Sequence, residues 1–432
     1  MVTQLGSSRL VRRGILGAKM RLNRHPRLKT AVSEARFKLW QVWVRQRGSH
    51  THPAFDVNRT CLVDPATIRY ALPEDWTGLV SRKYANRGKI AGGTWDLRRV
   101  RFEDTDIYKA FHAHFVEGQA WRETDLYRRV MGEIGRGHVL YGCRTARDYD
   151  AKCAALDAIF EDIKHNGYRP QVDIARAEHD PYKGEDEISV CIDRHGEFLF
   201  EDGRHRLAIA KILGVRRIPV KITVAHKAWN DFRTEVLDYA RTHDGHVYQR
   251  IPHPDLCEVP STYGDRRWDV LRQHLPVRTG VVLDIGAHWG RFCHQFEDLG
   301  FGCHAVESSV RNAYFLEKLR RAANKRFCVH CVSVFDYNQP TRFDIVLALS
   351  IFHHFIKEKG SFEKWLAFLG RLDMDAMFFE PHLPEEPQMA GAYRNLNNQD
   401  FVKLIMDNSC LTQAEHIGES EDGRRLYLLQ RK

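Results

Sequence analysis

The chain has 432 residues, of which 43% are hydrophobic and 28% are charged. This length is enough for two or three domains, each with its own hydrophobic core. Ordinary contents of glycine (30 residues) and proline (15 residues) exclude a collagen-like or low-complexity chain. The longest nearly apolar stretch, residues 345–352, is far shorter than the about 20 residues of a membrane-spanning helix. We therefore expect no transmembrane segment.

The formal net charge of +10 is concentrated at the N-terminus. Residues 1–60 contain 13 of the 66 basic residues and 2 of the 56 acidic residues, which leaves 53 basic and 54 acidic residues for the rest. The chain is therefore a basic arm followed by a nearly neutral body. This distribution disfavours a protein that binds nucleic acid over its whole surface.

Within the arm, apolar residues recur every three or four positions from residue 28 to residue 43, which predicts an amphipathic helix. Basic side chains fill much of the remainder, and Gly48 would end the helix. This helix would lie on an anionic membrane surface or a phosphate-rich partner, or it would dock on the body with its basic face in solvent. An organellar transit segment is a third interpretation.

Ten cysteines are scattered along the chain, and no secretory signal precedes them. We expect reduced thiols and a cytoplasmic protein, peripheral at a membrane if the arm binds one. A single C-x-x-C pair, Cys328 and Cys331, falls in residues 327–334, which predict a buried strand. Because no second pair accompanies it, we expect neither a metal site nor a redox site there.

After the arm, residues 61–245 mix helical and extended patterns and predict an α+β domain. Residues 92–96 indicate a turn into a strand, and residues 124–134 indicate a helix. The clearest pattern is a strand at 188–193, a strand at 198–200, a tight loop at 201–203, a helix at 204–213 and a strand at 218–224. A proline-rich linker is predicted at residues 246–265.

Beyond the linker, strands and helices alternate regularly. The predicted strands are 280–285, 303–306, 327–334, 345–349 and 377–380; the predicted helices are 290–299, 362–369 and 400–407; a closing pair of strands is 411–417 and 425–430. Alternating elements of this kind predict an α/β domain, residues 266–432, with a mostly parallel, doubly wound, Rossmann-like sheet.

A glycine-containing turn joins the first strand of this domain to the next helix. Gly286 and Gly290 would let the backbone approach a ligand closely, and the helix that follows presents free N–H groups. Glu307 ends the next strand, where a carboxylate accepts hydrogen bonds from ribose hydroxyls. A dinucleotide-binding turn is the alternative, but it usually has the spacing G-x-G-x-x-G rather than G-x-x-x-G.

Together with the closing strand pair, these motifs resemble those of the class I S-adenosylmethionine-dependent methyltransferases over residues 265–432. The further matching segments are 343–349 and 379–381. The resemblance implies that S-adenosyl-L-methionine is the cofactor and that it is bound by Asp284, Gly286, Ala287, His288, Gly290, Glu307, Ser333, Val334 and Leu349. Two residues depart from the family pattern: His288 replaces the middle glycine, and Ser333 replaces the usual aspartate at the end of the third strand, which would face the adenine.

The methyl acceptor is harder to predict. A hydroxyl acceptor needs a base, because its pKa lies far above 7. His353 and His354 follow the fourth strand and are the first candidates; Glu380, which ends the fifth strand, and His382 come next. In the alternative interpretation, one histidine packs against a helix and the other is solvated. The Pro-Pro-aromatic motif of amino-methylating DNA enzymes is absent here, which disfavours that substrate.

Residues 202–206 (Asp202, Gly203, Arg204, His205 and Arg206) open a predicted helix and resemble the helix-capping turn of the ParB/sulfiredoxin-like fold. The resemblance implies a site for a nucleotide, such as ATP or ADP, or for another anion. A helix N-terminus, an unhindered glycine and two guanidinium groups suit that chemistry. No thiol lies within this turn, which disfavours sulfiredoxin activity.

The sequence therefore predicts a two-domain transferase. Its C-terminal domain would O-methylate a small molecule or a glycan, and its ParB-like domain would bind a nucleotide or a phosphorylated group, or transfer phosphate itself. The alternative is a nucleic-acid-binding protein that recruits a methyltransferase to DNA or RNA. Such a complex would lose affinity steeply as salt is raised.

Overall fold

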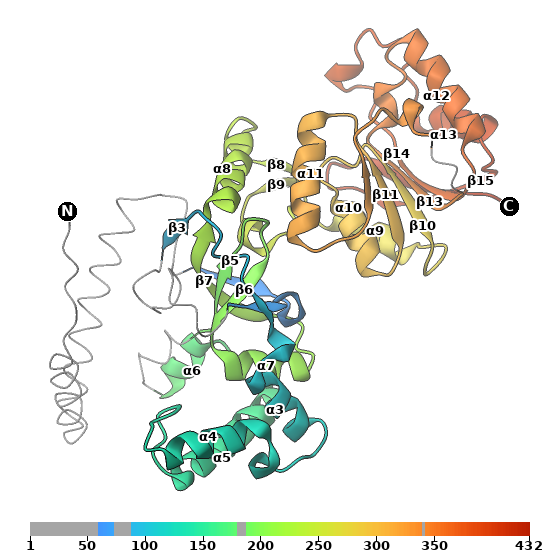
Figure 1. Cartoon of the computed structure of the whole chain (residues 1–432). Coiled ribbons are helices and arrows are strands. Elements are labelled where there is room, and N and C mark those ends of the chain that lie inside the picture. The colour runs from blue at the N-terminus through green and yellow to red at the C-terminus, as the bar shows by residue number, and fades with distance from the viewer. Residues whose placement is uncertain (1–58, 73–87, 179–186, 339–341) are drawn as a thin grey trace, which may run out of the picture. The chain divides into compact units, whose positions relative to one another are not determined.

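Two large β-sheets organise the computed structural model, which describes residues 59–72, 88–178, 187–338 and 342–432 (Figure 1). Residues from Thr60 to Lys432 belong to one compact unit. The helix predicted between residues 28 and 48 lies outside the described residues. The first large sheet and its helices come from the chain before residue 245, and the second comes from the chain after residue 280.

The first sheet is mixed, with the strand order β1-β7-β5-β6-β2-β4 and with β3 paired to β7. Its strands are β1 (Thr60–Val63), β2 (Tyr70–Ala71), β3 (Lys89–Ala91), β4 (Val100–Arg101), β5 (Ser189–Ile192), β6 (Phe198–Asp202) and β7 (Ile218–His226). Strands β5 and β6 form an antiparallel hairpin, and β7 runs parallel to β5 on its other side. Every residue of β7 is buried, as its central position requires.

The predicted tight loop at residues 201–203 is wrong in part. Glu201 and Asp202 continue strand β6, because Asp202 still pairs with Ser189 across the hairpin. The turn is confined to Gly203, whose φ of 91° is left-handed and opens the following helix directly. The helix and the strand predicted after it are confirmed as α7 and β7.

The helices of this half are α3 (Asp106–Phe115), α4 (Asp125–Gly135), α5 (Ala146–Asn166), α6 (Gln171–Glu178), α7 (Arg204–Ile212) and α8 (Lys227–Arg241). Threonine hydroxyls cap three of them: Thr105 begins α3, Thr124 begins α4 and Thr145 begins α5. The helix predicted at residues 124–134 is thereby confirmed. None of the helices among the described residues has the length and apolarity needed to cross a membrane.

The segment predicted as a linker carries regular structure. Strands β8 (Val247–Gln249) and β9 (Ser261–Tyr263) form a small parallel sheet. Between them, His253 and Asp255 are buried. The His253 Nε2 lies 3.0 Å from the carbonyl oxygen of Gly196, and the indole N–H of Trp229 donates to Asp255 at 2.9 Å. The predicted linker is therefore a packed segment.

The second sheet has the order β12-β11-β10-β13-β14-β16-β15. Its strands are β10 (Val281–Ile285), β11 (Gly302–Val306), β12 (Cys328–His330), β13 (Phe343–Leu349), β14 (Met374–Glu380), β15 (Gln413–Glu419) and β16 (Arg425–Gln430). The first five are mutually parallel, and β16 is antiparallel to both β14 and β15. The chain reverses its winding direction at β10, so the predicted doubly wound sheet is confirmed.

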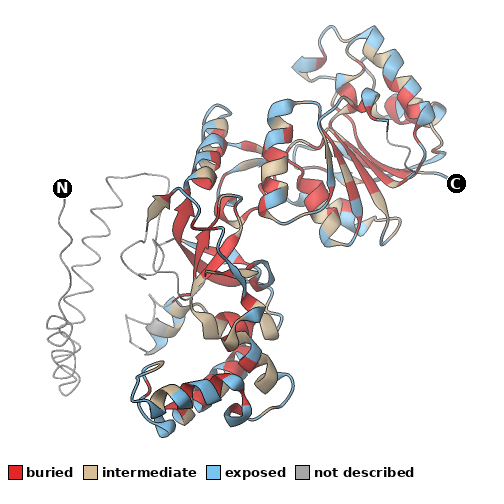
Figure 2. Ribbon diagram, viewed as in Figure 1, coloured by how far each residue is buried: buried red, intermediate tan, exposed pale blue. Residues whose placement is uncertain are grey.

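Helices cover both faces of this sheet. One core joins it to α9 (Arg266–Gln273), α10 (Arg291–Asp298) and α11 (Val310–Ala322) through Leu271, Phe296 and Leu316. The other core joins it to α12 (Lys359–Arg371) and α13 (Asn398–Asp407) through Trp365 and Phe401. Figure 2 shows the strands buried between helices whose outer faces are exposed.

The predicted strand at residues 327–334 is too long, and its predicted burial is wrong. Strand β12 ends at His330, and Val334 instead begins a short 3-10 helix, Val334–Asp336. Cys328 and Cys331 are both exposed. The reason is position: β12 is the edge strand of the sheet, and only β11 pairs with it.

Candidate functional site

The turn between β10 and α10 has left-handed backbone at every second residue. Gly286, His288 and Gly290 have φ values of 68°, 52° and 78°. The amide groups of Gly286 and Ala287 both donate to the carbonyl oxygen of Val306, at 2.9 and 3.1 Å. The turn is therefore tied to the end of the neighbouring strand β11.

Glycine is required at Gly286 by space as well as by conformation. A Cβ atom there would lie 2.7 Å from Cδ1 of Ile351, the second residue after β13. At His288, where the family pattern has glycine, the left-handed backbone costs about 1–2 kcal/mol. The half-buried imidazole packs against Trp289 and Tyr248, with ring centroids 5.3 and 5.2 Å away, and this packing offsets the strain.

Glu307 lies next to this turn, at the carboxyl end of β11, and is only 7% exposed. Its Oε2 accepts a hydrogen bond from the amide of His288, and its Oε1 accepts one from the amide of Ser309, both at 2.8 Å. Burial raises the pKa of Glu307, and these amide hydrogen bonds oppose that rise. The carboxylate is thus held in one orientation.

Asp284 ends up in a different environment from Glu307. It is buried within β10, and the thiol of Cys293 donates to its Oδ2 at 3.5 Å. Burial raises the pKa of Asp284 to about 7, and the nearby charge of Glu307 adds to the rise. Asp284 therefore lies beneath the turn, while Glu307 flanks it.

The remaining predicted cofactor residues lie on either side of the turn. Ser333 caps the 3-10 helix after β12, and its Oγ accepts the amide of Phe335 at 3.3 Å. Val334 packs into one of the two sheet cores. Leu349 is the last residue of β13 and pairs with Glu380 of β14.

Three imidazoles follow β13 and β14. His353 is buried, and its ring centroid lies 4.0 Å from that of His354 and 5.9 Å from that of His382. The Nδ1 atoms of His353 and His382 are buried without a hydrogen-bond partner, whereas Nε2 of His382 contacts Asn395 at 2.9 Å. Burial, with added repulsion from His354, lowers the pKa of His353 to about 3. The imidazole of His353 is therefore neutral near pH 7.

Glu380 is fully engaged by side chains that sequence reasoning did not identify. Arg267 makes a two-point ion pair with it, at 2.7 and 3.0 Å, and both side chains are buried. The hydroxyl of Ser350 donates to Glu380 at 2.5 Å and accepts from Arg424 at 2.7 Å. Burial raises the pKa of Glu380, and the charge of Arg267 opposes this rise. Because both carboxylate oxygens of Glu380 are bound by Arg267 and Ser350, the geometry gives Glu380 a positioning role.

These groups share the carboxyl edge of the second sheet. Ile351 touches Gly286 of the β10 turn and precedes the histidine pair by two residues. The amide of Ser350 donates to the carbonyl of Glu380 at 3.1 Å. The structure therefore brings the predicted cofactor turn and the predicted bases to one edge, where ligands bind in doubly wound sheets.

The predicted anion-binding residues lie at the end of β6 and the start of α7, and their side chains contact different partners. Gly203 opens α7, whose N-terminus has no side-chain cap, and the amide of Gly203 itself donates to Asp202 at 2.9 Å. His205 stacks on Phe111 with the ring planes only 4° apart. Arg206 lies 3.4 Å from Glu187, a carboxylate that also accepts the hydroxyl of Tyr168 at 2.9 Å. The side chains of Asp202, His205 and Arg206 therefore all have partners within the protein, and the N-terminus of α7 is left without a side-chain cap.

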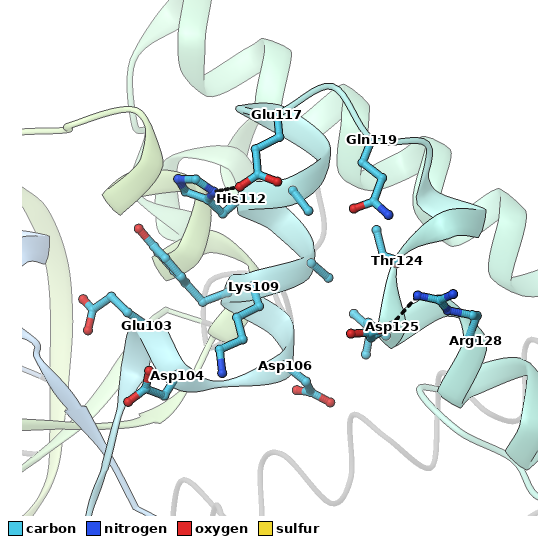
Figure 3. A pocket seen from close by; sticks show the side chains of 14 residues that line it. Glu103, Asp104, Asp106, Lys109, His112, Glu117, Gln119, Thr124, Asp125 and Arg128 are labelled. Atoms are coloured by element: carbon cyan, nitrogen blue, oxygen red, sulfur yellow. Dashed lines mark hydrogen bonds and ion pairs between the residues drawn. The ribbon is translucent and has the colours of Figure 1, made fainter.

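A depression of about 530 Å³ lies on α3 and α4, and none of the residues 202–206 lines it (Figure 3). Nδ1 of His112 lies 3.0 Å from Oε1 of Glu117, and the guanidinium of Arg128 donates to Oδ1 of Asp125 at 2.6 Å. The charged residues that line it are Glu103, Asp104, Asp106, Lys109, Glu117, Asp125 and Arg128. Because acidic groups predominate, this depression does not suit a phosphate.

No family model matches the sequence, and no curated protein matches it. The bifunctional kinase-methyltransferase WbdD is similar at 20% identity and a TM-score of 0.37, over 45% of this chain and 46% of WbdD. The 1,6-didemethyltoxoflavin-N1-methyltransferase of Burkholderia thailandensis, solved with S-adenosylhomocysteine, is similar at 19% identity and a TM-score of 0.31, over 38% of this chain and 76% of that one. The N-methyltransferase NodS from Bradyrhizobium japonicum follows at 9% identity and a TM-score of 0.32, over 39% of this chain and 94% of that one.

The left-handed conformation of His288 can be tested by stability. We expect His288→Gly to be more stable than His288→Ala by about 1 kcal/mol, because both variants lose the ring contacts and only alanine retains the backbone strain. The measurement is urea denaturation followed by tryptophan fluorescence. Ala287→Gly is the control, because φ is not left-handed there and glycine should only destabilise. Equal stability of the two His288 variants would show that the backbone strain is not real.

Proposed function

We propose that residues 266–432 form an S-adenosylmethionine-dependent methyltransferase domain that O-methylates a small molecule or a glycan. The observation that carries this proposal is the pairing of the left-handed turn after β10 with the fixed carboxylate of Glu307. The turn lies where the sheet reverses direction, which is the ligand-binding position of such folds. A dinucleotide-binding sheet of this class has six parallel strands, whereas β16 here is antiparallel, which favours the methyltransferase interpretation.

The residues present fit this cofactor. At Gly286, a Cβ atom would fill the space beside Ile351. The N-terminus of α10 has no side-chain cap. Glu307 would accept hydrogen bonds from the ribose hydroxyls of the cofactor, and the first turn of α10 would face the carboxylate of its methionine part. When bound, S-adenosylmethionine supplies an electrophilic methyl group. Transfer then depends on positioning the acceptor and on removing its proton.

His353 and His354 would accept that proton. His353 presents an unpartnered Nδ1, is neutral near pH 7 and lies next to the exposed imidazole of His354, so a proton can pass between the two rings and solvent. His382 would complete the group, with its own free Nδ1. Glu380 would hold Arg267 and Ser350 in place beside them.

We expect Glu307→Ala to weaken S-adenosylmethionine binding about tenfold or more, because a charge-assisted hydrogen bond contributes about 1.5–3 kcal/mol. Isothermal titration calorimetry measures this directly. Glu297→Ala is the matched control: Glu297 also accepts backbone amides, those of Arg326 and Phe327, but it lies on α10 away from the strand ends. Wild type that binds no S-adenosylmethionine, or a Glu307→Ala variant with unchanged affinity, would refute the assignment.

For the base, we expect His353→Asn to lower turnover about 100-fold, with cofactor affinity changed less than about twofold. Turnover is followed with radiolabelled S-adenosylmethionine and the hydroxyl acceptor that wild type methylates best. Because the pKa of His353 is about 3, its base form persists, so at saturating cofactor the ionisation of His353 should cause no fall in the wild-type rate from about pH 8 to about pH 6. His416→Asn, an exposed histidine on β15, is the control. Full activity of both His353→Asn and His354→Asn would exclude this pair as the base.

We further propose that the Asp202–Arg206 turn binds a nucleotide or a phosphorylated group. Its support is the N-terminus of α7, which has no side-chain cap, with Arg204 and Arg206 on the first turn. The Glu187–Arg206 contact at 3.4 Å would exchange for the anion.

Equilibrium dialysis with ATP, ADP and inorganic phosphate tests this second site. Arg206→Ala should lower affinity about tenfold or more, as expected for loss of one charge-assisted contact, whereas Arg216→Ala, an exposed arginine after α7, should not. Wild type that retains none of the three anions would refute the site.

A further inference from the structure

Three potential metal ligands gather on one face of the edge of the second sheet. In the parallel pair β11–β12, His304 is opposite Cys328 and Val306 is opposite His330. Because side chains alternate along a strand and paired residues share a face, His304, Cys328 and His330 all project from the same side. Their ligand atoms all lie within 4.8 Å of one another.

The two imidazoles already have the spacing of a metal-bound pair. Nε2 of His330 lies 3.3 Å from Nδ1 of His304, and the two ring planes differ by only 6°. In a tetrahedral zinc site, with Zn–N distances of about 2.0–2.1 Å, two nitrogen ligands are about 3.3 Å apart. Cys328 is exposed, so its thiol can turn toward the nitrogens without disturbing a core.

The chemistry of the three side chains also suits a cation. Neutral imidazole and thiolate are the forms that bind metals. The hydroxyl of Tyr337 lies 2.8 Å from Nδ1 of His304, and this contact would be exchanged for the ion on binding.

We propose that His304, Cys328 and His330 bind a zinc ion, with water as the fourth ligand. Two imidazoles and one thiolate favour zinc over magnesium or calcium, which prefer oxygen ligands. On binding, the Cys328 thiol releases its proton to solvent. The ion joins the edge strand β12 to β11 directly beside Glu307, whose amide donates to the carbonyl of His330 at 3.0 Å. The ion would thus stabilise the pairing of the edge strand β12 with β11, and it would take no part in the chemistry of methyl transfer.

Cobalt(II) provides the test, because it replaces zinc and reports thiolate ligation by an intense near-ultraviolet charge-transfer band. The full chain, without a histidine tag and kept reduced, is stripped with a chelator and titrated with cobalt(II). We expect one equivalent to bind with this band, and zinc to abolish the band by displacement. Zinc should also raise the Tm, because it binds the folded state.

Three variants sharpen the result. Cys328→Ser should remove the charge-transfer band, and His330→Asn should weaken cobalt binding about tenfold or more. Cys331→Ser is the matched control, because this exposed thiol is three residues away and outside the cluster, and it should behave as wild type. A wild-type protein that shows no band would overturn the proposal, as would a band that is lost in Cys331→Ser but retained in Cys328→Ser.

Discussion

The turn after β10 is the constraint on which the rest of the C-terminal half depends. Two of its amides donate to one carbonyl, that of Val306, and a third, that of His288, donates to the carboxylate of Glu307. Such a dense set of bonds to the neighbouring strand requires left-handed backbone at Gly286, His288 and Gly290. The turn and Glu307 are therefore one unit: the carboxylate that would bind a ribose is also what holds the turn in shape.

A buried charge pair gives order to the opposite side of the same edge. Arg267 and Glu380 are both nearly inaccessible, and their two-point contact compensates much of the cost of taking each charge out of water. Arg267 also lies over the ring of Tyr263, with its guanidinium carbon 3.6 Å from the ring centroid. The residues between β8 and α9 thereby contribute to the site, although by composition they resemble a connection between domains.

The two halves of the described chain differ in how they treat imidazole. After strands β13 and β14, His353 and His382 each have a buried Nδ1 without a hydrogen-bond partner, which suits proton transfer. On α7, His205 stacks against Phe111, and burial lowers its pKa to about 4. An anion in the turn beside Gly203 would therefore be met by backbone amides and guanidinium groups, and not by a charged histidine.

Much of the second sheet could be predicted from the sequence, because its signals are local. Apolar runs of strand length, separated by helical stretches, predict β10, β11, β13 and β14 within a few residues. The glycines of the turn after β10 are also a local signal, because their left-handed φ values belong to a few consecutive residues. The same holds for the threonine caps of α3, α4 and α5, where one hydroxyl serves an amide in the next turn of chain.

The tertiary structure decided what depends on distant residues. By sequence position alone, Glu380 is a candidate catalytic base. In the fold, its carboxylate is paired with the guanidinium of Arg267, 113 positions earlier in the chain. Cys328 lies in an apolar stretch that predicts burial, but β12 is the last strand on its side of the sheet and leaves the thiol exposed. His304 joins Cys328 and His330 only through the pairing of two parallel strands. Strand order and register are set by the packing of the whole domain, and no local pattern of residues encodes them.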